Sequence, residues 1–246
     1  MVGSRPLTAG VFLALALAAA TAASAGSRYD VKGAHATREA LLAGERSAWK
    51  AARAISWGPS IYRTTFRALW ADDGLFVRFE ARDSEPWHTY TRHDDKLWNE
   101  EVVEIFLDPD RSGTHYLELE ISPANVTVDV HILHPLPQNE GDPPWKADFG
   151  WDIAGLETRV GLRTRGTATE GWTATAFVPW EGLRSLPSTK QIAFPPRAGD
   201  RWRFNVFRIE RPRRPDGTRG EVLLAWSPAH IPKFHVPSAF RDLVFR

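Results

Sequence analysis

The chain has 246 residues, of which 43% are hydrophobic and 25% charged, so it can bury the core of one globular domain or of two small ones. The 31 Lys and Arg nearly balance the 30 Asp and Glu, which excludes a surface field that would gather nucleic acid or an anionic membrane. The absence of cysteine excludes disulfides, thiol catalysis and thiolate metal sites. Eleven tryptophans exceed what packing needs, which indicates that some of them form a binding surface.

The first 25 residues predict a cleaved signal peptide. Arg5 precedes a small, apolar run from Leu7 to Ala20, and Ala23-Ser24-Ala25 has the A-x-A pattern of a signal peptidase site. The run is too short for a comfortable bilayer span, and no basic stop-transfer flank follows Ala25, so an uncleaved anchor is the weaker alternative. We therefore expect cleavage after Ala25, no membrane span, and a secreted or periplasmic protein.

Residues 26–51 are expected to form an N-terminal segment outside the main fold, with a short helix over Thr37 to Leu42. From Ile61 onward the hydrophobic period becomes two. The strands Ile61–Trp70 and Leu75–Arg82 flank Asp72-Asp73-Gly74, a sequence typical of a hairpin turn.

Further short strands with alternating hydrophobicity follow to the C-terminus. They are expected at Glu101–Leu107, Tyr116–Ile121, Val126–Leu133, Glu157–Arg165, Trp172–Val178, Arg201–Glu210, Val222–Trp226 and Leu243–Phe245. Trp180 to Leu186 is the only helical stretch among them, and Pro135–Pro144 and Arg211–Arg219 are loops. This pattern predicts an all-β fold, a single antiparallel β-sandwich over residues 52–246, with Trp172, Trp180, Trp202 and Trp226 in its core.

Three glutamates are predicted to share one face of this sheet. Alternation places Glu104 on the face of its strand opposite to that of Val103 and Ile105. On the next strand, Glu118 and Glu120 lie on the face opposite to that of Leu117 and Leu119. A carboxylate between apolar neighbours is costly unless it is paired or meets a polar ligand. The trio is therefore either an ion-pair network, with Arg208 as the balancing cation, or part of a binding face.

Other chemistry has weaker signals. Glu104 with a second carboxylate has the residue types of a glycoside hydrolase, but any large sheet contains such pairs. The oxygen-rich turns around Asp94 and Asp95, and around Asp108 and Asp110, could hold Ca²⁺. No nucleophile elbow and no phosphate-binding glycine loop is present, so we name no catalytic residue and favour a protein that is not an enzyme.

Several segments resemble the blocks of family 9 carbohydrate-binding modules, in the same order along the chain. These segments are Leu75-Phe76-Val77 with Asp83, Leu97 to Asp108, Gly171 to Trp180, Gly199 to Arg208, and Trp226 to Phe240. Together they span roughly Ala52 to Arg246. The resemblance implies a β-sandwich of the DOMON-like kind, related to immunoglobulin-like jelly rolls, often with bound calcium, and a slot that holds sugar rings between two aromatic side chains.

By this resemblance, Trp98 matches the first aromatic wall and Glu104 the acid that hydrogen-bonds sugar hydroxyls. The second wall falls on Phe234, next to His235. Where well-known members supply Arg and Asn to the ligand, this chain has Glu118 and Glu120. The chain resembles the stand-alone, exported branch of the family, whose partner would be a saccharide or polysaccharide in carbohydrate catabolism.

The leading hypothesis is therefore an exported, monomeric, non-catalytic carbohydrate-binding protein. Trp98, Glu104, Glu118, Arg208, Phe234 and His235 are the candidate ligand-binding residues. A DOMON-type haem or redox domain and a glycoside hydrolase using Glu104 are the alternatives. We expect no haem, because cleavage removes the single methionine, and two of the eight histidines would have to face one pocket.

Overall fold

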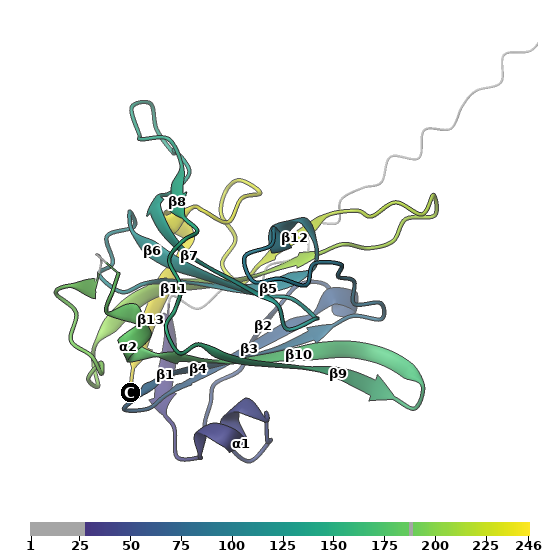
Figure 1. Ribbon diagram of the computed structural model, residues 1–246, viewed down its shortest axis with the longest axis horizontal. Coiled ribbons are helices and arrows are strands. Elements are labelled where there is room, and N and C mark those ends of the chain that lie inside the picture. Colours follow the sequence, from purple (N-terminus) through teal and green to yellow (C-terminus); the bar gives the residue numbers. More distant parts are fainter. Residues whose placement is uncertain (1–27, 187–188) are drawn as a thin grey trace, which may run out of the picture.

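The computed structural model describes residues 28–186 and 189–246, so the predicted signal peptide (1–25) lies outside the described residues. The described chain is built mainly of strands, with short helices between them (Figure 1). The strands are β1 (Arg28–Gly33), β2 (Ile55–Trp57), β3 (Thr64–Trp70), β4 (Gly74–Arg82), β5 (Val102–Asp108), β6 (Tyr116–Ile121), β7 (Thr127–His134), β8 (Lys146–Asp148), β9 (Glu157–Arg165), β10 (Ala168–Pro179), β11 (Arg201–Glu210), β12 (Val222–Ala225) and β13 (Arg241–Phe245). The helices are α1 (Arg38–Leu42), α2 (Trp180–Leu183) and the 3-10 helices η1 (Ser60–Tyr62), η2 (Leu97–Asn99) and η4 (Pro237–Ala239).

The strands form two stacked layers, which confirms the predicted β-sandwich (Figure 1). One layer has the order β8-β7-β6-β5-β11-β13, with β12 paired to β11. The other has the order β3-β4-β10-β9, with β2 paired to β3. All these pairs are antiparallel, as expected for strands joined by tight turns and loops.

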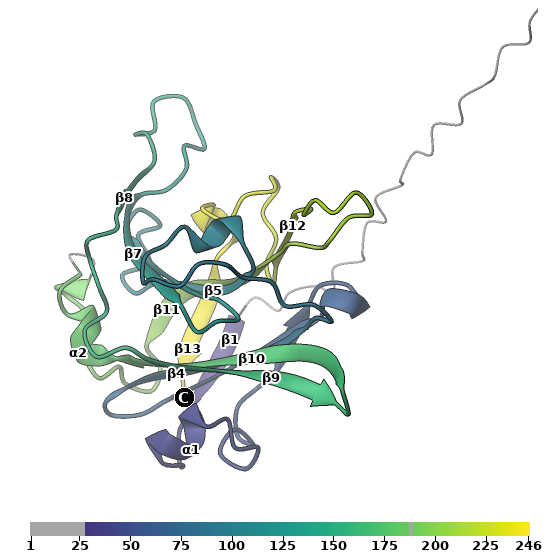
Figure 2. The ribbon, with the colours of Figure 1, turned by 45° about the vertical axis from the view of Figure 1, so that its right-hand side comes forward.

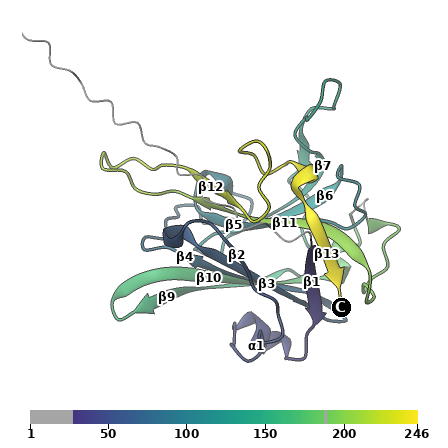
Figure 3. The ribbon, with the colours of Figure 1, turned by 180° about the vertical axis from the view of Figure 1, so that it is seen from behind.

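Strand β1 joins the two layers and corrects the expected boundary of the fold. Its residues Arg28–Val31 pair in parallel with β13, and Lys32 and Gly33 pair in parallel with β3 (Figure 3). The segment 26–51 therefore contributes a central strand rather than standing outside the sandwich. The sequence signal was weak because Arg28–Gly33 alternates charged with apolar residues over only a few positions.

The predicted strands and helices agree closely with the structure. Helix α1 begins after Thr37, whose hydroxyl accepts a hydrogen bond from the backbone N–H of Ala40. The hairpin turn at Gly74 is also confirmed, and a Cβ at this position would lie 2.4 Å from the ring of Phe177, so only glycine fits. The short strands β2 and β8 were missed because three residues are too few to show a period.

The main core lies between the layers and contains the four tryptophans that the sequence places there. Trp172, Trp180, Trp202 and Trp226 are at most 7% exposed. A second cluster lies under α1, where Leu41 and Leu42 cover the outer face of the β3-β4-β10 layer. A third apolar cluster lies on the outer face of the β5-β6-β7 layer, and it forms the base of the candidate site.

Two irregular segments cover this outer face. The segment from Asp83 to Glu101, which includes η2, crosses it, and the loop before β13 brings Phe234 and Phe240 against it. The loop between β7 and β8, predicted at Pro135–Pro144, extends from the edge of the same layer (Figure 2). Because these segments rise above a flat sheet, they leave a hollow between them.

Candidate functional site

Glu104, Glu118 and Glu120 lie together on the outer face of the β5-β6 pair, as alternation predicts. Glu104 is directly opposite Glu120 across the two strands, and Glu118 is opposite Phe106. One carboxylate oxygen from each of the three lies within 4.8 Å of those of the other two. All three side chains are buried, and Glu104 and Glu120 are each only 1% exposed.

Burial dominates the electrostatics of this acidic trio. It raises the pKa of Glu104 well above its usual range, and the neighbouring Glu118 raises it further. The pKa of Glu120 is raised in the same way, by burial and then by Glu104 and Glu118, whereas burial raises that of Glu118 to about 7. Two ionised carboxylates at this separation repel by about 3 kcal/mol at an effective dielectric constant of about 20. All three carboxyls therefore favour the protonated form more than an exposed glutamate does.

The hollow above the trio has a volume of about 350 Å³, within the range of small-molecule sites. Glu118 and Glu120 belong to its lining, and the remaining lining residues are Trp98, Val128, Val130, Trp145, Phe149 and His235. The ring of Phe149 lies between the two indoles, with centroids 5.6 Å from Trp98 and 6.3 Å from Trp145. Trp145 and Phe149 are each 39% exposed, so flat aromatic surface faces solvent beside buried acids.

His235 forms one side of this hollow and is held by its neighbours. Its ring stacks on Phe106 at 5.0 Å, and its Nδ1 lies 3.0 Å from the hydroxyl of Tyr116. Its Nε2 lies 3.7 Å from Oε2 of Glu118. Burial lowers the pKa of His235 to about 4, so the imidazole is neutral at pH 7 and does not offset the charge of the trio.

Phe234 is not among the residues that line the hollow. Its ring stacks on Phe207 with centroids 4.3 Å apart, as part of the apolar cluster on the outer face. The indole across Phe149 from Trp98 is that of Trp145, which the sequence analysis missed together with Phe149. Trp145 and Phe149 flank β8, directly after the proline-rich loop predicted at Pro135–Pro144; two aromatic residues beside that loop were the available signal.

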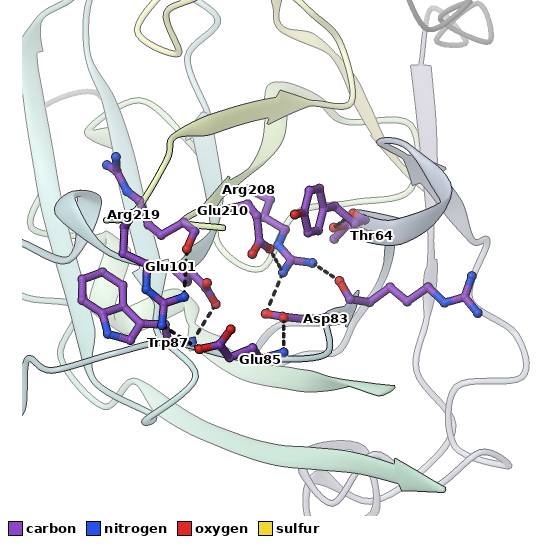
Figure 4. A network of polar contacts seen from close by, with 11 residues as sticks. Thr64, Asp83, Glu85, Trp87, Glu101, Arg208, Glu210 and Arg219 are labelled. Carbon is purple, nitrogen blue, oxygen red and sulfur yellow. Dashed lines mark hydrogen bonds and ion pairs between the residues drawn. The ribbon is translucent and has the colours of Figure 1, made fainter. Parts of the chain in front are cut away.

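Arg208 does not balance the acidic trio, which corrects the expected pairing. It is opposite Val103 across β5 and β11, and therefore faces the interior of the sandwich while Glu104 faces outward. Its guanidinium donates to Asp83, to Glu210 and to the backbone carbonyl of Arg82 (Figure 4). The side chain is fully buried, so this network closes one end of the core.

The network around Arg208 also contains Glu101, which accepts a hydrogen bond from the backbone N–H of Trp87 (Figure 4). Burial, reinforced by the nearby Glu210 and Asp83, raises the pKa of Glu101 to about 10. Glu101 is therefore protonated at neutral pH, and one arginine then faces the two carboxylates of Asp83 and Glu210. This arrangement holds β4, β5 and β11 together at one end of the sandwich.

Of the four aspartates predicted as metal ligands, Asp94 lies in a cluster with the donors that a cation needs. Donor atoms of His93, Asp94, Asp129 and Asp152 all lie within 4.8 Å of one another. Asp129 is 1% exposed, and its Oδ1 has no hydrogen-bond partner among the described residues. Three carboxylates suit Ca²⁺, and the imidazole of His93 also suits a transition metal, so the donor set fits a divalent cation.

The other predicted metal ligands have local roles. Asp95 accepts hydrogen bonds from the backbone N–H groups of Thr91 and Arg92. Asp108 and Asp110 accept from backbone N–H groups in the turn after β5. Within residues 28–186 and 189–246, neither aspartate of this turn belongs to a group of three or more candidate metal ligands.

The fold and the hollow define a class: a β-sandwich protein with aromatic side chains gathered over buried carboxylates on the outer face of one layer. A family model described as "carbohydrate family 9 binding domain-like" matches residues 45–194, and the chain belongs to that family. The resemblance noted from the sequence is thereby confirmed.

Known relatives agree with this membership. A protein of Arthroderma benhamiae called an extracellular protein is 27% identical over 189 residues, which cover 74% of this chain and 78% of that protein. A family 9 carbohydrate-binding module from Caldicellulosiruptor kristjanssonii, solved in complex with cellotriose, is similar with a TM-score of 0.61 at 15% identity, over 89% of this chain and 93% of that one. The structure of such a module from the same organism with glucose gives a TM-score of 0.59 at 15% identity, over 89% and 95%. At this identity the two structures establish the fold.

The described helices are all short. None of those in the part of the chain that the structure describes has the length and apolar character needed to cross a membrane.

Proposed function

We propose that this chain is an exported, non-catalytic carbohydrate-binding protein that holds a saccharide in the hollow between Trp98, Trp145 and Phe149. The observation that carries the proposal is the gathering of exposed aromatic rings over buried hydrogen-bonding groups in one hollow of about 350 Å³. Sugar rings offer apolar C–H faces with hydroxyls around the rim, so a site for them combines flat aromatic side chains with a few oriented polar groups.

In this arrangement the indoles of Trp98 and Trp145, together with the ring of Phe149 that contacts both, offer flat apolar surface to the C–H faces of the sugar. Glu118, Glu120 and His235 line the same hollow and reach its hydroxyls. Membership of the family and the saccharides bound to two similar structures support this function.

The placement of the acids supports binding without turnover. Glycoside hydrolysis needs two carboxyl groups that flank the scissile bond. Glu104 and Glu120 are instead cross-strand neighbours, with Glu118 two positions along β6, so all three lie on one side of a bound sugar.

Intrinsic tryptophan fluorescence, titrated with neutral mono- and oligosaccharides, tests the proposal. We expect a saturable change that Trp98→Ala and Trp145→Ala each weaken at least tenfold. Trp87→Ala is the matched control, because its half-buried indole packs on Arg219 and does not line the hollow. Product analysis of the same mixtures should show intact saccharide. Binding that survives both hollow variants, or a hydrolysed product, would contradict the proposal.

Export is part of the same proposal. The leader-like pattern of residues 1–25 supports it, as does the extracellular description of the relative from Arthroderma benhamiae. N-terminal sequencing of the protein recovered outside the cytoplasm should begin at Gly26, and an intact N-terminus in that fraction would contradict cleavage after Ala25.

We also propose a structural Ca²⁺ site formed by Asp94, Asp129 and Asp152 beside His93. The unpartnered, buried Oδ1 of Asp129 supports it, and bound calcium would supply neutralising charge between η2 and β7. Calcium should raise the melting temperature of the protein, and Asp129→Asn should abolish the rise while Asp110→Asn leaves it unchanged. A larger rise with Zn²⁺ than with Ca²⁺ would assign the site to a transition metal instead.

A further inference from the structure

The acidic trio beneath the hollow has no cationic partner in the described chain. Among residues 28–186 and 189–246, the only basic side chain within ion-pair distance of Glu104, Glu118 or Glu120 is His235, which is neutral at pH 7. Arg208, the cation that the sequence analysis expected here, faces the other side of the sheet. Buried carboxyls that gather without a cation favour their protonated forms, and a cation that enters the site would stabilise their ionised forms.

One carboxylate oxygen without a partner lies at the hollow, and a second lies on the neighbouring strand. Glu120 lines it, is 1% exposed, and has no hydrogen-bond partner for Oε2 among the described residues. Oε1 of Glu104, on the opposing strand, is likewise without a described partner. Because unsatisfied buried acceptors are rare in folded proteins, these two oxygens point to a donor that a ligand brings.

The geometry matches a protonated amine. An ammonium group has three N–H donors arranged tetrahedrally, and charge-assisted hydrogen bonds of about 2.8 Å require acceptor oxygens about 4.6 Å apart. Each glutamate of the trio offers one oxygen within 4.8 Å of the other two. We propose that the saccharide bound in the hollow carries a protonated amino group, and that Glu104, Glu118 and Glu120 bind this group while Trp98 and Trp145 stack on the sugar ring.

This inference rests on the proposed function, since it names the ligand class of the same hollow. The hydroxyls of a neutral sugar can donate to these oxygens, but they bring no positive charge to stabilise ionised carboxylates. A bare divalent cation would use the oxygens of the trio, but Ca²⁺ takes six to eight oxygen ligands, whereas the rest of the lining is largely aromatic and aliphatic. An amino sugar uses both the acids and the aromatic rings.

Protonation provides a separate test. The raised pKa values of Glu104 and Glu120 favour the protonated form of these carboxyls in the free protein. An ammonium group stabilises their ionised forms, so its binding should release protons to the buffer. Binding of a neutral sugar has no such effect on the trio.

The experiment is isothermal titration calorimetry with a matched pair of ligands, the β-1,4-linked trisaccharide of glucosamine and cellotriose, at about pH 5.5, below the ordinary range of amine pKa values, so that the amine is protonated before it binds. The two ligands differ in an amino group in place of one hydroxyl on each ring. We expect the glucosamine trisaccharide to bind at least tenfold more tightly, with an apparent enthalpy that depends on the ionisation enthalpy of the buffer. The preference should shrink at high salt.

Two variants separate this inference from the proposed function. Glu118→Gln with Glu120→Gln should weaken binding of the glucosamine trisaccharide at least tenfold more than binding of cellotriose, whereas Trp98→Ala should weaken both ligands to a similar extent. Thermal unfolding checks that each variant is folded. The dependence of binding on salt and buffer is measured on the unaltered protein, so this part of the test needs no variant.

Equal affinities for the two trisaccharides would overturn the inference and leave the proposed function intact. A preference for the amine that survives the double Gln variant would also overturn it. If neither ligand binds to the folded protein, both the inference and the proposed function fail. Competition by calcium chloride alone, lost in the double Gln variant, would assign the trio to a metal ion instead.

Discussion

Replacing Glu118 with Gln should make the protein more stable at alkaline pH and change little at acidic pH. Glu118 is buried beside Glu104 and Glu120, and burial raises its pKa from 4.5 to about 7. In the unfolded chain the same group ionises freely near pH 4.5. The folded state therefore holds a proton that the unfolded state loses as the pH rises between these two values.

The sign and size follow from this difference. Below pH 4.5 the Glu118 carboxyl is protonated in both the folded and the unfolded state, so the folded protein has its full stability. This contribution to stability is lost as the pH rises through about 7. A rise in pKa from 4.5 to about 7 corresponds to about 3 kcal/mol, at about 1.4 kcal/mol per pH unit. Glu118→Gln removes this titration while keeping the shape of the side chain. Between pH 4 and pH 8, the free energy of unfolding of the variant should therefore fall by about 3 kcal/mol less than that of the unaltered protein.

Urea unfolding followed by tryptophan fluorescence at several pH values measures this. Other buried acids with raised pKa values, Glu101 and Asp108 among them, also make the stability depend on pH over this range, so the quantity to compare is the difference between the two proteins at each pH. Glu140→Gln is the matched control, because this glutamate is exposed in the loop between β7 and β8 and should shift nothing. If the unaltered protein and Glu118→Gln have parallel pH profiles, Glu118 is not desolvated and the electrostatic reasoning about the trio is wrong.

Three further outcomes are expected. Arg208→Ala leaves Asp83 and Glu210 buried without a cation and should lower the free energy of unfolding by about 3–5 kcal/mol, whereas Arg213→Ala, at an exposed ion pair, should lower it far less; similar losses in urea unfolding would contradict the structural role of Arg208. Phe234→Ala should lower the free energy of unfolding by about 2–4 kcal/mol in the same assay, because the ring of Phe234 packs on Phe207 and does not line the hollow. If the variant instead loses saccharide affinity at unchanged stability, Phe234 contacts the ligand. Removal of divalent cations with a chelator should lower the melting temperature of the unaltered protein and leave that of Asp129→Asn unchanged. Equal falls in the melting temperatures of the two proteins would mean that the cation binds outside the cluster around Asp129.

Local pattern in the sequence was sufficient for most of the strands and for which way their side chains face. Alternation is a property of the strand itself, so Glu118 and Glu120 could be placed on the face opposite Leu117 and Leu119 before any partner strand was known. The same reasoning placed Trp172 and Trp202 in the core. It failed for β1, whose parallel partners, β3 and the C-terminal β13, are not adjacent to it in the sequence.

The make-up of the hollow depended on tertiary structure. Trp98, Trp145 and His235 are far apart in sequence and come from three irregular segments, whose courses over the sheet no hydrophobic period encodes. Residue type alone made Arg208 a natural counter-ion for the acids. The register of β11 against β5, however, turns its side chain to the other face of the sheet. The sequence by itself determined the strands, the core and the shared face of the three glutamates, because each depends on neighbouring residues; only the folded chain decided which aromatic rings and which charges meet over that face, because that depends on how distant loops pack against it.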